Sequence, residues 1–131
     1  MALRKTKIAG RSFGPIVHLD EGETVMLVIT DIRDNVGPHS STLIGARQLG
    51  GEEISLPGHA ILVDTLMRSE RVLPSVFELA RKTKIGEAID YEVEAYDYTE
   101  EQILADKGGA EIVKATASLL QAKIDALPPR A

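Results

Sequence analysis

The chain has 131 residues and a formal net charge of −5, and it contains no cysteine and no tryptophan. This length allows one domain with its own hydrophobic core, and the lack of cysteine excludes disulfides, thiolate zinc sites and cysteine nucleophiles. No apolar run approaches the roughly 18 residues needed to cross a bilayer, and the first residues lack the apolar stretch of a secretory signal. We therefore expect a cytoplasmic protein with no membrane partner.

The beginning of the chain is basic. Gly10, Gly14 and Pro15 favour an extended segment over a helix. In chain order we predict a basic arm over residues 1–20, a β domain over 21–98 and a helical extension over 99–131. The four cations of residues 1–11, which contain no acid, are Arg4, Lys5, Lys7 and Arg11.

Three strands are predicted in the first half of the domain. Residues 23–33 are rich in β-branched side chains and almost continuously apolar at first, as in a strand buried on both faces. Turn-forming residues at 34–38 separate this strand from a second one over 41–49. Gly50 and Gly51 then favour a tight hairpin turn into a third strand over 52–56.

A helix and a hairpin follow. Apolar residues recur at helical spacing over 59–68, with Pro57 just before the helix. Strands are expected over 75–80 and 88–98, and the turn between them carries three cations and a glycine, namely Arg81, Lys82, Lys84 and Gly86. Such a basic hairpin can contact a phosphate backbone, although turns are often polar without binding anything.

The last third of the chain predicts two helices. Thr99 and Gln102 have the spacing of a capping box, so a helix should begin there, and Gly108–Gly109 should end it. A longer helix is expected over 110–127, packed either on the end of its own β domain or on a neighbouring subunit. Its apolar stripe comprises Ile112, Val113, Ala115, Leu119, Leu120, Ile124 and Leu127.

The predicted order of three strands, one helix and two strands is that of an OB-fold. Together with residues 56–66, which read LPGHAILVDTL, and the lysine-containing hairpin turn, this order resembles small OB-fold single-stranded-DNA-binding proteins of phages. The resemblance covers about residues 24–97. It departs from the family pattern at Ala80, where glycine is usual, and at residues 73–75. It implies a mainly β fold with α-helix, namely a five-stranded OB-like barrel plus a C-terminal helix.

The resemblance also implies a nucleic-acid-binding surface. The hairpin cations would contact phosphates, two aromatic rings would stack on bases, and two arginines of the central strands would contact the backbone. From the residues alone, Phe77 shares its phase with Leu79 and fits a core position, whereas Tyr91 lies between acids and should be exposed. The predicted binding residues are Arg33, Arg47, Arg81, Lys82, Lys84, Phe77 and Tyr91.

Catalytic and metal-binding motifs are weak in this sequence. His18, His39 and His59 are far apart and lack a second ligand at a suitable spacing, and Asp31 with Asp34 is too small a set for a calcium loop. A glycine-rich phosphate loop is also missing. We expect no enzyme activity, no metal and no cofactor.

Three functional hypotheses remain open. The leading one is a non-catalytic protein that binds single-stranded nucleic acid without sequence preference, and it depends on a closed barrel whose cations gather beside one groove. The alternative is a structural subunit of a phage virion or similar assembly, whose terminal arms contact copies of itself and other subunits. The third is an adaptor that recruits a basic partner, because residues 87–111 carry nine acids against Lys107 alone.

Overall fold

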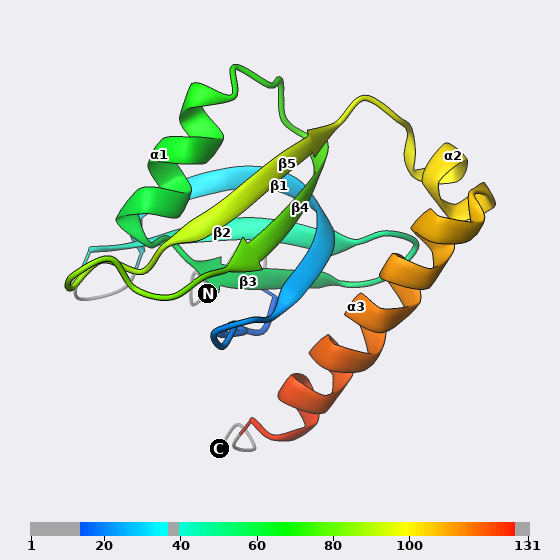
Figure 1. Ribbon diagram of the computed structural model, residues 1–131. Coiled ribbons are helices and arrows are strands. Elements are labelled where there is room, and N and C mark those ends of the chain that lie inside the picture. The colour runs from blue at the N-terminus through cyan, green and yellow to red at the C-terminus, as the bar shows by residue number, and fades with distance from the viewer. Residues whose placement is uncertain (1–13, 37–39, 128–131) are drawn as a thin grey trace, which may run out of the picture.

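The computed structural model describes residues 14–36 and 40–127, which form a five-stranded antiparallel sheet with three helices (Figure 1). The predicted class, mainly β with α, is confirmed. Predicted and observed strand bounds differ by at most three residues. The elements are β1 (Thr24–Val36), β2 (Ser41–Gln48), β3 (Glu53–Pro57), α1 (Ala60–Arg68), β4 (Ser75–Arg81), β5 (Tyr91–Tyr96), α2 (Glu100–Ala105) and α3 (Lys107–Asp125).

The sheet is open, with strand order β3-β2-β1-β4-β5. Within the described residues β3 and β5 are the two edge strands and do not pair, so the expected closure into a barrel is not confirmed. The outer edge of β3 has a different partner, because the amide of Val17 donates to the carbonyl of Ser55 and the amide of Ser55 donates to the carbonyl of Pro15, both at 2.9 Å. This parallel contact satisfies the backbone groups of β3 that a barrel would pair with β5.

The first described residues belong to the folded body. Val17 and Leu19 are 1% and 2% exposed and lie in the main core with residues of β1, β2, β3 and β4. The arm that we predicted over residues 1–20 therefore has its last residues packed against the sheet. The predicted arm residues 1–13 lie outside the described part of the chain.

Strand β1 lies at the centre of the sheet and is buried on both faces, as predicted. Val25, Leu27 and Ile29 point into the main core, whereas Met26 and Val28 belong to a second cluster on the opposite face. This second cluster is covered by Ile103 of α2 and by Ile112 and Val113 near the start of α3, whereas the later part of α3 reaches the main core. The near-continuous apolar pattern of β1 thus reflects two separate cores.

Helix α3 packs on the sheet of its own chain. Leu120 is completely buried in the main core, and the buried hydroxyl of Thr116 accepts a 3.0 Å hydrogen bond from the amide of Met26. Pairing of β1 with β2 begins only at Leu27, so Thr116 provides an acceptor where β2 provides none. The apolar stripe therefore serves the intramolecular core, with Leu127 at its end still 39% exposed.

The boundary between α2 and α3 differs from the prediction. Gly108 and Gly109 lie in the first turn of α3, and the break falls at Asp106, whose carboxylate accepts from the amide of Gly109 at 2.9 Å. A Cβ on Gly109 would overlap the backbone oxygen of Ile103. The glycine therefore allows the two helices to approach closely, in addition to any helix-breaking tendency.

Of two local predictions, the capping box at Thr99 and the two-residue turn at Gly50 and Gly51, only the first is confirmed. The capping box exists, since Thr99 Oγ1 accepts from the amide of Gln102 at 3.2 Å and Gln102 Oε1 accepts from the amide of Thr99 at 2.9 Å. Gly50 adopts a positive φ of 68° in the connection between β2 and β3. That connection contains residues 49–52, which makes it longer than the expected two-residue turn.

Candidate functional site

An aromatic pair lies where the start of α1 meets the start of β5. His59, the N-cap residue of α1, stacks on Tyr91 with ring centroids 5.9 Å apart and an interplanar angle of 24°. Tyr91 is only 7% exposed, so the exposed position that we expected from its acidic neighbours is wrong. The reason is tertiary: Tyr91 faces the main core and the helix, whereas its neighbours Asp90 and Glu92 alternate away from it.

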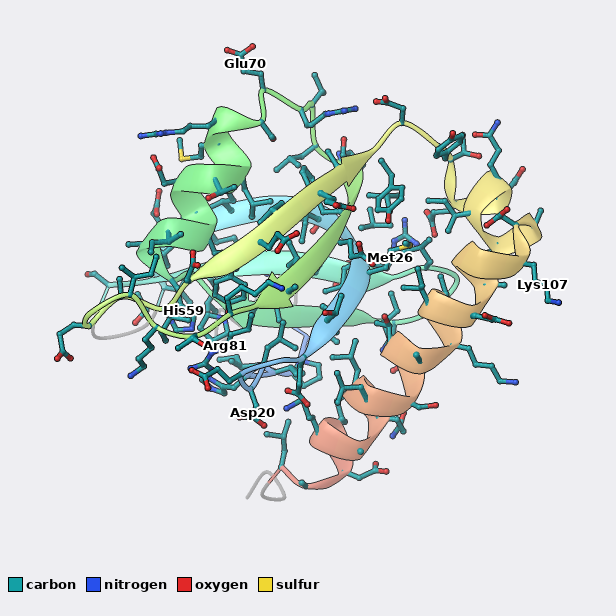
Figure 2. The ribbon with its side chains drawn as sticks, in the orientation of Figure 1. Asp20, Met26, His59, Glu70, Arg81 and Lys107 are labelled. Carbon is teal, nitrogen blue, oxygen red and sulfur yellow. The ribbon has the colours of Figure 1, made fainter. Side chains whose placement is uncertain are left out.

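Arg81 lies beside this pair at the end of β4 (Figure 2). Its register partner across the hairpin is Tyr91, and one guanidinium nitrogen, Nη1, donates to the carbonyl of Leu19. The Nε of Arg81 is buried and has no hydrogen-bond partner within the described residues. Arg81 therefore places its positive charge next to the aromatic pair, while its Nε is closed to solvent.

The charge of Arg81 also acts on the two rings. Burial lowers the pKa of His59 below its ordinary 6.5, and the positive charges of Arg81 and His18 lower it further. Burial raises the pKa of Tyr91, against a smaller lowering by Arg81. Both rings are consequently mostly neutral at pH 7, and the positive charge at this place comes from Arg81. We call His18, His59, Arg81 and Tyr91 the His59 cluster.

The hairpin lysines differ from each other. Lys82 forms a 3.2 Å ion pair with Glu92 of β5. Lys84 is exposed in the loop after β4 and forms no ion pair with any residue of the described chain. Of the two, Lys84 is the one whose charge is not balanced by a neighbouring carboxylate.

The two arginines of the central strands are held by carboxylates. Arg33 Nε donates to Asp31 Oδ2 at 2.7 Å, and Arg47 donates to both carboxylate oxygens of Glu100 at 2.7 and 2.5 Å. Arg47 is opposite Val28 in the sheet and shares its face, whereas Arg81 is two residues from Leu79 and shares the opposite face. The structure thus does not bring Arg47 and Arg81 together.

Phe77 is fully buried in the main core, at 0% exposure. It is paired with Leu27 of β1 and Ala95 of β5, and all three side chains lie on the face of the sheet that forms the main core. The phase that it shares with Leu79 predicted this position from the sequence, and a base cannot reach the ring in this conformation.

The outward face of β4 and β5 is acidic. Glu78 and Glu94 are register partners, and Glu92 lies two residues away on the same face. Burial raises the pKa of Glu78, and Glu94 raises it further, while Tyr96 Oη donates to Glu78 at 3.3 Å. This face repels a phosphate backbone, which confines any nucleic-acid contact to other surfaces.

Glu78→Gln is expected to stabilise the protein at pH 7 by about 0.5 kcal/mol, because it removes a like-charge pair across the two strands. The pKa of Glu78 is raised in the folded state, so the penalty exists above the ordinary value of 4.5 and disappears as the pH falls below it. Urea unfolding midpoints at about pH 7 and about pH 4 test this expectation. Glu21→Gln, at an exposed turn position, is the matched control. The expectation would be contradicted if Glu78→Gln destabilised the protein, or if its effect on stability were the same at both pH values.

A separate apolar pocket lies between the sheet and the α2–α3 corner. Its volume is about 550 Å³, and Met26 and Ile103 of the second core cluster form part of its lining. Figure 2 shows Met26 on the side of the sheet that faces α3. We call this cavity the α2–α3 pocket; its lining residues are Met26, Tyr96, Tyr98, Gln102, Ile103, Asp106, Gly108, Gly109 and Ile112.

Sequence reasoning missed the two histidines of the His59 cluster as binding candidates. We had considered His18 and His59 only as metal ligands, and their sequence separation hid their proximity. The sequence held one signal for the position of His59. A helix was predicted to start after Pro57 and Gly58, and an N-cap residue lies at the surface end of a helix. The chain order alone does not reveal that the loop between β4 and β5 ends beside the start of α1.

Residues 14–36 and 40–127 contain no group of three or more histidine, aspartate or glutamate side chains placed to hold a metal ion. None of the helices in these two ranges has both the length and the apolarity that crossing a membrane requires. Comparisons with protein-family models, with curated proteins and with solved structures give no significant match.

Proposed function

We propose that the protein binds single-stranded nucleic acid without sequence preference, through the His59 cluster and Lys84. The observation that carries the proposal is the stacked pair of His59 and Tyr91 beside the positive charge of Arg81, the register partner of Tyr91. Neutral rings and an adjacent arginine are the elements with which nonspecific single-strand binders hold bases and phosphates. His59 is the half-buried member of the pair and provides the accessible ring.

The connectivity of the sheet supports the same proposal. β1 lies between β2 and β4, and α1 connects β3 to β4, which is the strand order of an OB-fold. In that fold the loop between the last two strands contributes to ligand binding. Here this loop carries Lys84 and starts directly after Arg81.

The proposed surface is smaller than the one expected from the sequence. Arg33, Arg47 and Lys82 have carboxylate partners, and Phe77 is in the core. With only a few cations available we expect weak binding with a small dependence on salt, because the salt slope grows with the number of phosphate contacts. The logarithm of the affinity should fall linearly with the logarithm of the salt concentration, with a slope of about −0.7 per phosphate contact.

Fluorescence anisotropy of a labelled oligothymidylate of about 20 nucleotides, measured at about 50 and 200 mM salt, tests the proposal. Lys84→Glu is expected to weaken binding and to reduce the salt slope by about 0.7. His59→Ala should weaken binding at both salt concentrations, because stacking does not depend on counterion release.

The matched control is Lys107→Glu, which changes the net charge equally on α3, away from His59 and Arg81 (Figure 2). It should bind like the wild type apart from a small general charge effect. Absence of wild-type binding at about 50 mM salt would refute the proposal, as would equal losses in the Lys84 and Lys107 variants.

A second candidate is self-association as an assembly subunit. It is favoured by two exposed apolar side chains at the end of α1 and in the loop after it, Met67 at 69% and Val72 at 86% exposure. Light scattering of the full chain would give a mass above that of the monomer, and Met67→Ser with Val72→Ser would restore the monomer. A strict monomer at high concentration would exclude this candidate.

A further inference from the structure

The α2–α3 pocket is independent of the His59 cluster. It lies over the second core cluster, on the face of the sheet covered by α2 and α3, whereas Tyr91 and Arg81 belong to the face of the main core. Its lining is mainly apolar, and Tyr98 at its rim is 62% exposed although its neighbour Tyr96 is largely covered. An exposed tyrosine above an apolar cavity of about 550 Å³ is a suitable contact for a chain segment with apolar side chains.

The surroundings of the pocket are acidic. Asp106 lines it, and the exposed Glu101 and Glu111 each directly precede a lining residue, Gln102 and Ile112. No lysine or arginine is among the lining residues, although Lys107 lies at the start of α3. The acids disfavour a nucleic acid at this place and favour a cationic occupant.

Residues 1–13 have the complementary composition. They carry four cations and no acid, interspersed with the apolar residues Leu3, Ile8 and Phe13. A segment of this kind can place aliphatic side chains in the pocket while its cations contact the acidic rim. Burial of one aliphatic side chain of this size contributes about 1.5–3 kcal/mol.

The point at which the described chain begins allows this segment to reach the pocket. Gly14 lies against Glu53, since its carbonyl accepts a 3.0 Å hydrogen bond from Ser55 Oγ and a Cβ on it would overlap the Glu53 backbone oxygen. Glu53 starts β3, directly after the turn in which the amide of Gly50 donates to Glu100 of α2 at 3.3 Å. The segment therefore leaves the sheet at the end next to α2, and thirteen extended residues span about 43 Å.

We propose that residues 1–13 of the chain dock into the α2–α3 pocket of the same molecule, with the apolar side chains of the segment in the cavity and its cations on Asp106, Glu101 and Glu111. This inference does not depend on the nucleic-acid proposal. Docking would make α2 and α3 part of a larger core.

The test uses a protein that starts at Gly14 and a synthetic peptide of residues 1–13, followed by ¹⁵N-correlated NMR. This shortened chain retains all buried residues of the two described clusters. Added peptide should shift the amides of Gly108, Gly109 and Ile112, while the full-length protein should bind the peptide about tenfold more weakly because its own segment occupies the pocket.

Variants separate docking from nonspecific attraction. Tyr98→Ala in the shortened protein should weaken peptide binding about tenfold, and its matched control Met67→Ala, at an equally exposed apolar position on α1, should not. A peptide with Leu3→Ser and Ile8→Ser keeps all charges and should bind about tenfold more weakly than the native peptide.

Four results would overturn the proposal. The first is the absence of amide shifts on addition of the peptide, and the second is amide shifts centred on Glu78, Glu92 and Glu94. The third is equal affinity of the native peptide and the serine peptide. The fourth is a full-length dimer that becomes a monomer when residues 1–13 are removed. No nucleic acid is present in this experiment, so its failure leaves the His59 cluster unaffected. Loss of oligonucleotide binding in turn leaves the docking proposal unaffected.

Discussion

Phe77→Ala is expected to destabilise the protein by about 3–5 kcal/mol, which is a large part of the stability of a domain of this size. The ring is completely buried in the main core, beside its register partners Leu27 of β1 and Ala95 of β5. Its removal loses the transfer free energy of the ring and leaves a cavity that the surrounding strands cannot fill. Urea unfolding followed by circular dichroism measures the effect as a lower midpoint with an unchanged slope.

Phe77→Leu is the control that separates core packing from base stacking. It conserves much of the buried volume and should cost clearly less than the alanine variant. A folded Phe77→Leu protein should bind an oligonucleotide like the wild type, because the ring has no accessible face. Wild-type stability of Phe77→Ala, or loss of oligonucleotide binding in a stable Phe77→Leu variant, would contradict the core position.

Thr116→Val is expected to cost about 1–3 kcal/mol, although valine has nearly the same shape as threonine. The hydroxyl of Thr116 is the acceptor for the amide of Met26, and both residues are at most 2% exposed. Without this oxygen the amide of Met26 is buried and unsatisfied, since β2 does not pair with β1 before Leu27. The measurement is the free energy of unfolding, together with hydrogen exchange of the Met26 amide, which should become faster.

Thr116→Ser keeps the hydroxyl and loses one methyl group, so it should cost less than Thr116→Val and keep the Met26 amide protected. Ala117, the next residue on α3, is exposed, and Ala117→Val controls for the β-branched side chain in a helix. If the serine and valine variants were equally destabilised with equal amide exchange, packing rather than the hydrogen bond would account for the role of Thr116.

The local elements were predictable because their signals lie within a few neighbouring residues. The capping box of Thr99 and Gln102 starts α2 as expected, and the apolar run of β1 is buried on both faces. The phase of Phe77 with Leu79 also predicted a core position correctly. In each case side-chain pattern and backbone hydrogen bonding act over a range shorter than one element.

The candidate site was predicted less well because ion pairs and stacking join distant segments. Arg47 and Glu100 are 53 residues apart in sequence but share two hydrogen bonds, which neutralise a predicted phosphate contact. His59 and Tyr91 come from a helix N-cap and a strand. The alternation that suggested an exposed Tyr91 says which residues share a face of β5, but not what covers that face.

The class of the fold, the order and approximate bounds of its strands and helices, and the acidic and basic stretches of the chain follow from the amino-acid sequence. The folded chain was needed to show that the sheet is open, that residues 15–17 cover the edge of β3, and that α3 satisfies the amide of Met26. The physical reason is that periodicity and turn chemistry are local properties of the chain. Edge pairing, charge neutralisation and burial of a given face depend on which distant segments meet, and chain connectivity does not specify those meetings.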